Sequence, residues 1–187
     1  VHMVLEFCPA GDLHDYLRDG ALRDTMSVDF MSQILAAIAH VHRAGLVHCD
    51  VKPANVLLCP SAGGGMVLKL SDFGLARSCG PEDWVSSSAG TPGFLALEVL
   101  AGRHNQLCDV WACGCILFEF LRGEWLVPDE VCADTNAQRT FLRSRAFYDC
   151  VVISRPSWRR GHAALEALLR RLLRLDVVDR PSSESAL

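Results

Sequence analysis

The sequence predicts an α+β fold that is mainly α, with short β-ribbons. Apolar residues recur at helical spacing in three long segments, 27–45, 109–121 and 163–175. Short apolar runs between the first two of these segments are typical of strands instead. A chain of 187 residues can bury one substantial core, which indicates a single domain.

The first element expected is a buried strand at residues 1–5, because this run is apolar. Asp12 is a candidate N-cap for a short helix that ends near Gly20. Ser27 then opens a stronger helix, whose apolar stripe ends at Gly45. These signals predict one strand followed by two helices.

The middle of the chain favours small ribbons over a large sheet. The expected strands are 46–48, 56–58 and 67–70. Residues 78–93 are rich in Ser, Gly and Pro and lack apolar periodicity, which predicts a long loop. Loops of that length are usually functional or disordered.

Helical patterns return in the second half, at 109–121 and 163–175. The stretch 124–160 is irregular, with one helix expected around 136–147. Arg180, Pro181 and Ser182 open a last helix.

Composition excludes several classes of protein. Half of the residues are apolar, a fifth are charged and the net charge is −4, so nothing favours nucleic acid or a membrane as partner. No apolar run reaches the roughly 18 residues of a membrane span. The nine Cys include no C-x-x-C pair, so we interpret them as structural thiols of an intracellular protein, cytoplasmic or nuclear. A cysteine-based metal or redox protein is the less favoured alternative.

Two polar motifs follow predicted strands. Residues 48–55 read His-Cys-Asp-Val-Lys-Pro-Ala-Asn, and residues 72–74 read Asp-Phe-Gly. Carboxylate and amide oxygens suit Mg²⁺, and an ammonium group can neutralise a phosphate. This pattern predicts phosphoryl transfer, with Asp50 as base toward a hydroxyl and Lys52 on the γ-phosphate. Asn55 and Asp72 are the candidate metal ligands.

These motifs resemble the catalytic loop, H-R-D-x-K-x-x-N, and the D-F-G of the eukaryotic protein kinases. Four more segments resemble that family in order: 3–13 its hinge, 90–98 its activation-segment end, 109–115 its long buried helix, and 172–181 its last motif. The resemblance implies the C-terminal lobe of a Ser/Thr kinase, with ribbons at the active cleft, using ATP and Mg²⁺.

The resemblance also implies residues that bind ATP. Leu5 would be the gatekeeper, and the Glu6 carbonyl and the Cys8 amide would bond adenine. Asp12 would reach the ribose, and Leu57 would lie under the adenine ring. The N-cap role remains the alternative for Asp12.

Other residues are implied as architecture. Glu98 would pair with Arg180, and Asp109 would hold the backbone of the catalytic loop. His48 and Phe73 would stack on each other, in the spine that reports the active state.

The activation segment carries Ser87 as a candidate phosphorylation site, with Ser86 and Ser88 beside it. The resemblance implies that Thr91 bridges Asp50 and Lys52, which favours Ser/Thr substrates.

The sequence departs from the family at two positions in these motifs. Cys49 stands where most kinases have the Arg that binds an activation-loop phosphate, so we expect weak dependence on such a phosphate. A rival reading makes Cys49 a nucleophile beside His48 and Asp50. Leu97 replaces the Pro of A-P-E.

The kinase motifs that precede the hinge, a Gly-rich loop and the Lys and Glu that pair, are missing from residues 1–187. We therefore expect a partial kinase domain over 1–187, without its N-terminal lobe and inactive by itself. The expected partners are a protein substrate with Ser or Thr and, as an open possibility, a regulatory subunit. The alternative function is a non-catalytic, pseudokinase-like interaction module.

Overall fold

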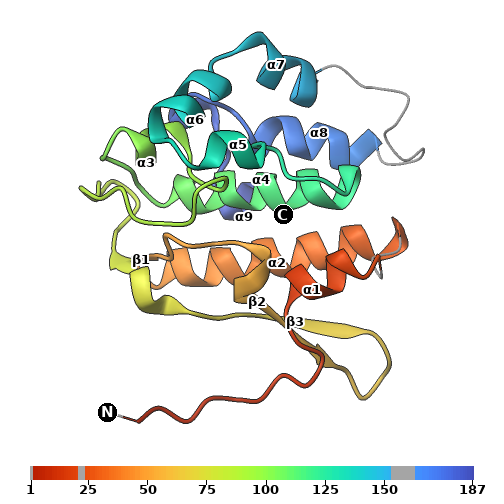
Figure 1. Ribbon diagram of the computed structural model, residues 1–187. Helices are drawn as coiled ribbons and strands as arrows, with labels where there is room; N and C mark the ends of the chain where they lie inside the picture. The colour runs from red at the N-terminus through yellow and green to blue at the C-terminus, as the bar shows by residue number, and fades with distance from the viewer. Residues whose placement is uncertain (1, 21–23, 153–162) are drawn as a thin grey trace.

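The computed structural model of this chain describes residues 2–20, 24–152 and 163–187, about half of which are helical, with two small antiparallel sheets (Figure 1). The mainly α fold with short ribbons is therefore confirmed. The helices in chain order are α1 (Leu13–Arg18), α2 (Asp24–Arg43), α3 (Leu97–Leu100), α4 (Leu107–Arg122), α5 (Asp129–Cys132), α6 (Thr135–Leu142), α7 (Arg145–Val152), α8 (Ala163–Leu172) and α9 (Ser183–Ala186).

Each sheet has two strands. Strand β1 (Leu46–Val47) pairs with β4 (Arg77–Ser78), and β2 (Val56–Pro60) pairs with β3 (Met66–Leu70). Short 3₁₀ turns adjoin these ribbons and the last motif: η1 (Pro53–Asn55), η2 (Phe73–Leu75) and η3 (Val177–Asp179). Because β1 leads into the first polar motif and β4 follows the second, the two ribbons bring both motifs to one place.

Helix α4 is the centre of the core. All but three of its sixteen residues are buried, and Trp111, Ile116 and Leu117 are almost completely inaccessible. It packs on α2 at one side and on α8 at the other. The α8 side is tight, since a Cβ at Gly114 would lie 2.6 Å from a methyl carbon of Leu173. Burial of each large apolar side chain stabilises the fold by roughly 1.5–3 kcal/mol. Helix α4 therefore contributes much of the stability of the core.

The sequence predicted the strong elements better than their ends. Helix α2 begins at Asp24, before the predicted start at Ser27. The single helix predicted at 136–147 is wrong, because the structure has α6 and α7 there, with a break at residues 143–144. Part of the irregular stretch, residues 153–162, lies outside the described residues.

The buried strand predicted at residues 1–5 is also wrong for the part described. Met3, Leu5 and Phe7 are 77%, 74% and 83% exposed, and residues 2–8 have no regular structure. A strand needs a partner for its backbone hydrogen bonds, and among the described residues no backbone hydrogen bond joins residues 2–7 to a neighbouring strand. Figure 1 shows it running away from the helices.

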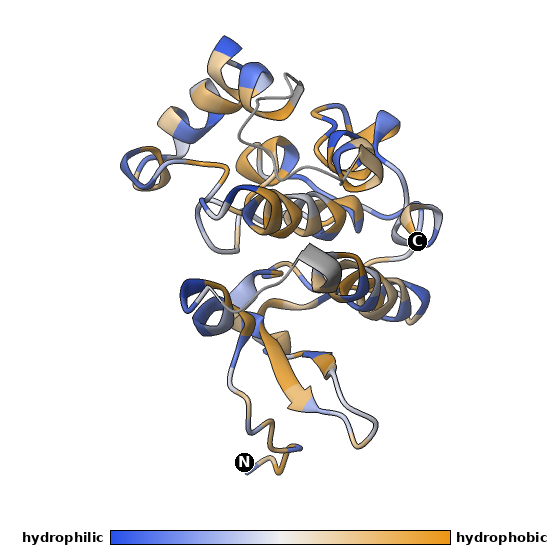
Figure 2. Cartoon of the chain, turned by 90° about the vertical axis from the view of Figure 1, so that its right-hand side faces the viewer, coloured by the Kyte–Doolittle hydropathy of each residue, from blue (hydrophilic) through white to orange (hydrophobic). Residues whose placement is uncertain are grey.

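The hydropathy of the chain differs between its packed and its exposed parts. Apolar residues concentrate on the packed helices and along the β2–β3 ribbon (Figure 2). In the portion of the chain that the structure describes, no helix is both long and apolar enough to span a membrane.

Candidate active site

Asp50, Lys52 and Thr91 form a closed triangle. The Lys52 ammonium lies 2.9 Å from Asp50 Oδ2 and donates to Thr91 Oγ over 2.6 Å. The Thr91 hydroxyl in turn donates to Asp50 Oδ1 over 2.6 Å. The arrangement ties a strand-following loop to a residue 41 positions further along the chain.

Asp50 is held in its ionised form. Burial alone raises the pKa of its carboxyl, but hydrogen bonds from Thr91 and Lys52 and the Lys52 charge outweigh it, so the pKa is lowered. Asn55 Nδ2 adds a third donor, at 3.0 Å from Asp50 Oδ2. A carboxylate held in this way is ionised at neutral pH and can orient and accept a proton from a hydroxyl.

Asn55 and Asp72 lie at the same end of the β2–β3 ribbon. The Asn55 carbonyl accepts from the Ser71 amide over 2.8 Å, and Asp72 is the next residue. Asn55 uses its amide nitrogen for Asp50, so its amide oxygen remains for a cation. The Asp72 carboxylate is exposed, and it accepts a 3.2 Å bond from the Gly74 amide within its own turn.

This donor set suits a hard cation. An amide oxygen and a carboxylate are ligands that Mg²⁺ accepts, and the ion usually completes its shell with waters and phosphate oxygens. Across the described ranges, no cluster of three or more His, Cys, Asp or Glu could hold a metal ion alone. The amide oxygen of Asn55 and the carboxylate of Asp72 therefore fit a Mg²⁺ ion.

Two backbone conformations shape the site. Among the described residues other than glycine, positive φ occurs at Cys49 (68°) and Asp72 (57°) alone. Residues other than glycine rarely adopt this left-handed backbone conformation, and such conformations cluster at functional sites. One lies in each polar motif, beside Asp50 and before Phe73.

Asp109 holds the first of these turns. Its carboxylate is 1% exposed and accepts from the backbone amides of His48 and Cys49, over 2.8 and 3.0 Å. His42 Nε2 lies 3.0 Å from the same group. This contact of Asp109 with the loop backbone is the one that the resemblance implies. The His42 contact was not foreseen, because the sequence places both His40 and His42 on the same helix without distinguishing them.

His48 joins the two motifs. Its Nε2 lies 3.0 Å from the Ser71 carbonyl, and its Nδ1 accepts from the Asp50 amide at 3.3 Å. Its ring meets Phe73 edge-on, with centroids 4.8 Å apart. His48 is completely buried, whereas Phe73 is 47% exposed. With both ring nitrogens engaged, His48 positions the loops.

Glu98 and Arg180 form a buried ion pair in which two guanidinium nitrogens meet the two carboxylate oxygens. The second bond measures 3.2 Å. Arg180 also donates to the Leu107 carbonyl over 2.8 Å and lies over Trp111. The pair lies away from Asp50 and joins α3 to the last motif, so it is architectural.

The residues expected to contact adenine and ribose are mostly exposed or make other contacts. Leu5 is 74% exposed, and Glu6 pairs with Lys69 over 2.6 Å. Asp12 caps α1 by accepting from Asp15 N over 2.9 Å, as its alternative role requires. Asp12 also bridges to Leu57 through the backbone. Cys8 lies beside the β2–β3 ribbon, where its sulfur contacts Cys59.

The loop at residues 78–93 contacts the 48–55 motif through Gly90. Its φ of 134° favours glycine, and a Cβ there would lie 2.8 Å from the Cys49 carbonyl oxygen. This close approach brings Thr91 onto Asp50. Ser87 is half-buried and accepts from Ala89 N over 3.1 Å, while Ser86 and Ser88 are exposed.

Cys49 does not have the geometry of a nucleophile. Its thiol is buried and contacts Cys108, and the internal space between it, Val99 and Ala112 measures about 10 Å³. That volume is too small for a substrate. The contact with Cys49, followed by burial, raises the pKa of Cys108 well above its usual value. All nine Cys are free thiols.

Sequence reasoning missed Glu119 as a functional candidate. Its Oε2 is buried without a hydrogen-bond partner in the described structure. Burial raises the pKa of Glu119, against smaller opposing effects of a Trp125 hydrogen bond and the charge of His14. The available signal was a lone acid within the apolar run of the α4 segment.

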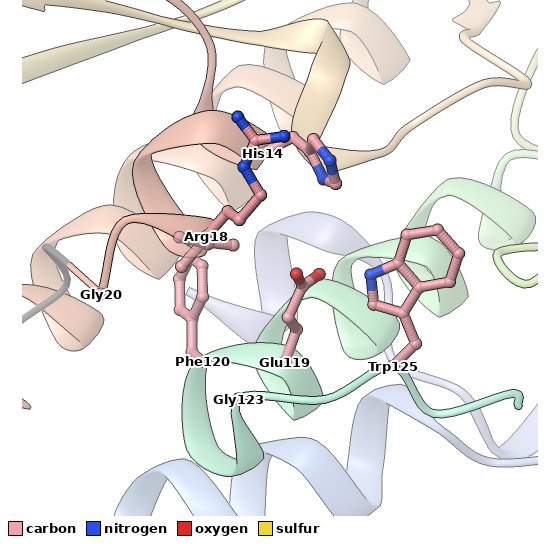
Figure 3. Close-up of a pocket in the computed structure, with 8 residues that line it drawn as sticks. His14, Arg18, Gly20, Glu119, Phe120, Gly123 and Trp125 are labelled. Atoms are coloured by element: carbon pink, nitrogen blue, oxygen red, sulfur yellow. The ribbon is translucent and has the colours of Figure 1, made fainter.

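Glu119 points into a hollow of about 370 Å³ between α1 and the end of α4 (Figure 3). His14 and Arg18 lie across it, and Trp125 flanks the carboxylate. A small space that Glu119 also lines reaches Phe94, three residues after Thr91. The hollow therefore places an acidic group near the segment that contacts Asp50.

Comparison with known proteins gives the class. The family model described as "Protein kinase domain" matches residues 1–187. The chain therefore belongs to the protein kinase family, and the fold and the Asp50 cluster agree with it.

Several relatives are Ser/Thr kinases by name. The serine/threonine-protein kinase unc-51 of Caenorhabditis elegans is 33% identical over 98% of this chain and 22% of its own length. The bovine phosphorylase b kinase gamma catalytic chain, liver/testis isoform, is 32% identical over 99% of this chain and 45% of its length. The Drosophila melanogaster ovarian-specific serine/threonine-protein kinase Lok is 32% identical over the whole chain and 39% of its length. The chain thus spans less than half of these relatives.

Proposed function

We propose that this protein transfers the γ-phosphoryl group of ATP to Ser or Thr hydroxyls of protein substrates. The observation that carries the proposal is the triangle of Asp50, Lys52 and Thr91. It presents an ionised carboxylate and an ammonium group side by side, at the end of a ribbon that also carries Asn55 and Asp72.

Each residue then has one task. Asp50 orients the substrate hydroxyl and accepts its proton, while Lys52 neutralises charge on the γ-phosphate. Asn55 and Asp72 hold Mg²⁺ against the phosphates. Mg²⁺ supplies charge neutralisation at the transferring group when bound.

The preference for Ser and Thr rests on Lys52 and Thr91. Family resemblance associates a Lys at this position with Ser/Thr substrates, and the named relatives are Ser/Thr kinases. The Thr91 hydroxyl bonds to both Asp50 and Lys52, which is the contact that the resemblance associates with Ser/Thr substrates.

We further propose that residues 1–187 act as the C-terminal lobe of a kinase domain. The exposed apolar side chains of Met3, Leu5 and Phe7 then contact a preceding lobe, and the backbone at Glu6 and Cys8 meets adenine. Exposed apolar runs of this kind mark contact surfaces. On this view residues 1–187 alone do not transfer phosphate.

The test uses the protein expressed from its complete coding sequence. Radiolabelled γ-phosphate of Mg²⁺-ATP is offered with mixed Ser, Thr and Tyr peptides, and the labelled amino acids are identified. The proposal expects label on Ser and Thr that disappears when EDTA removes Mg²⁺. A non-catalytic interaction module predicts no label on any peptide, and label on Tyr alone contradicts the Ser/Thr assignment.

A further inference from the structure

Cys8 and Cys59 form a close pair of thiols. Their sulfur atoms lie 2.7 Å apart, although the residues are 51 positions apart in the sequence. Cys8 belongs to the N-terminal segment and Cys59 to β2. Both are free thiols, and neither takes part in the site around Asp50.

Backbone contacts hold the two chain segments together. The Ala10 amide donates to the Leu58 carbonyl over 3.2 Å, and the Leu58 amide donates to the Gly11 carbonyl over 2.9 Å. Residues 10–12 therefore run antiparallel beside β2, directly next to Cys8 and Cys59. The course of the chain thus brings Cys8 and Cys59 side by side.

An ion pair holds the segment from its other end. Glu6 contacts Lys69 of β3 over 2.6 Å. Cys8 lies between this ion pair and the backbone bonds, so it is fixed on both sides against the β2–β3 ribbon.

A small oxidant can reach this pair more easily than the other thiol contact. Cys8 is half-buried, and the buried Cys59, with 9% exposure, contacts its sulfur. Cys49 and Cys108, the other contacting thiols described, lie within the core. A disulfide has an S–S distance of about 2.05 Å, so closing the bond needs a movement of well under 1 Å.

We propose that Cys8 and Cys59 are a modification site that forms a reversible disulfide when the protein meets a hydroperoxide. One cysteine, as thiolate, attacks a peroxide oxygen, becomes a sulfenic acid and releases an alcohol or water. The other sulfur attacks the sulfenic sulfur and displaces water. Two thiols and one peroxide thus give one disulfide, with two hydrogens lost from the protein.

The groups around Cys8 affect how readily its thiol loses its proton. The hydrogen bond with Cys59, then burial and the Cys59 charge, raise the pKa of Cys8 to about 11. Glu6 adds to this rise, and Lys69 opposes it. A thiol that keeps its proton reacts slowly with a peroxide, so the first step is slow at Cys8.

The bond would pin an otherwise exposed segment. Residues 2–8 have no regular structure, and the disulfide would join them covalently to β2. Its effect on nucleotide binding rests on the proposed function, because only then does the Cys8 backbone meet adenine. Formation of the disulfide does not depend on that function.

The test is peptide mapping of the full coding-sequence protein, reduced and then treated with hydrogen peroxide. Free thiols are blocked before digestion, without reduction. Cys59 shares its tryptic peptide with Cys49, because Lys52 precedes Pro53 and resists cleavage, so tandem mass spectrometry must locate the bond. A Cys132→Ser variant, which removes another half-buried thiol, serves as the matched control.

The expected result is a Cys8–Cys59 cross-linked peptide, two hydrogens lighter than its reduced parts, that dithiothreitol removes. It is lost in Cys8→Ser and in Cys59→Ser and kept in Cys132→Ser. The proposal is overturned if peroxide leaves both thiols free, so that the alkylating agent labels Cys8 and Cys59. It is also overturned if the disulfide joins Cys8 to Cys49, or if a non-reducing gel shows that it joins two molecules. Nucleotide binding is measured in a separate experiment. The disulfide can therefore be tested even if the proposed kinase function proves wrong.

Discussion

The Thr91 hydroxyl donates a 2.6 Å hydrogen bond to Asp50, and this contact ties the activation segment to the catalytic loop. It exists because Gly90 lets the backbone pass within contact distance of the Cys49 carbonyl. The same hydroxyl accepts from Lys52. One threonine thus sets the relative position of the two charged groups.

Replacing Thr91 by Ala should lower kcat/KM for phosphoryl transfer by roughly tenfold, about 1.4 kcal/mol, because Asp50 and Lys52 lose their shared partner. Thr91→Ser keeps the hydroxyl and should retain most of the activity. Steady-state kinetics of the full coding-sequence protein give the comparison. Equal losses in both variants would show that the methyl group, and not the hydroxyl, matters.

Asp109→Asn should destabilise the fold by roughly 2–4 kcal/mol, because a buried amide cannot accept from every donor that now faces the carboxylate. Those donors are the backbone amides of His48 and Cys49, with His42 at 3.0 Å. Urea unfolding measures the change. Asp29→Asn on the exposed face of α2 is the control, and a similar loss there would argue against a special role for Asp109.

His104 should make stability depend on pH. It is completely buried, and burial lowers the pKa of its ring despite the opposing charges of Asp109 and Glu98. As pH falls through about 6.5, His104 of the unfolded chain binds a proton, whereas His104 of the folded chain stays neutral. The contribution of His104 to the free energy of unfolding is therefore present above that pH and is lost as pH falls below it.

Urea unfolding at pH 7.5 and pH 5.5 checks this prediction. The free energy of unfolding should fall at the lower pH, and His104→Leu should reduce that fall. His40→Gln, at an exposed position of α2, should leave it unchanged. A fall that is the same in wild type and His104→Leu would assign the effect to other groups.

Phosphorylation of the loop serines should matter little. Cys49 is a buried thiol where the family has a phosphate-binding Arg, so a phosphate on Ser86, Ser87 or Ser88 lacks that guanidinium partner. Replacing all three serines by Ala should leave kcat/KM within about twofold. A phosphatase-treated sample is the parallel measurement, and a loss of more than about tenfold in either would contradict the expectation.

The sequence predicted those elements whose pattern lies within one continuous segment of the chain. The apolar stripe of α2, the buried run of α4 and the Asp12 cap are local patterns, and the structure has all three elements. The polar motifs around Asp50 and Asp72 were also visible as spacing, because each lies directly beside a strand.

Features that depend on distant contacts could not be predicted in this way. The strand expected at residues 1–5 fails because strand formation needs a partner that no local pattern guarantees. His42 reaches Asp109, 67 positions away, only after α2 packs on α4. The unpaired oxygen of Glu119 and the contact of Cys8 with Cys59 likewise become visible only when separate elements are brought together.

The most direct measurement of the central claim is the rate of phosphoryl transfer by the full coding-sequence protein and its Asp50→Asn variant. Asn keeps the size of the side chain but removes the ionised acceptor, so kcat should fall by roughly a hundredfold or more while Mg²⁺-ATP binding and the melting temperature change little. Wild-type rates in Asp50→Asn, or no transfer by either protein despite normal ATP binding, would contradict the assignment of Asp50 as the base of a working kinase.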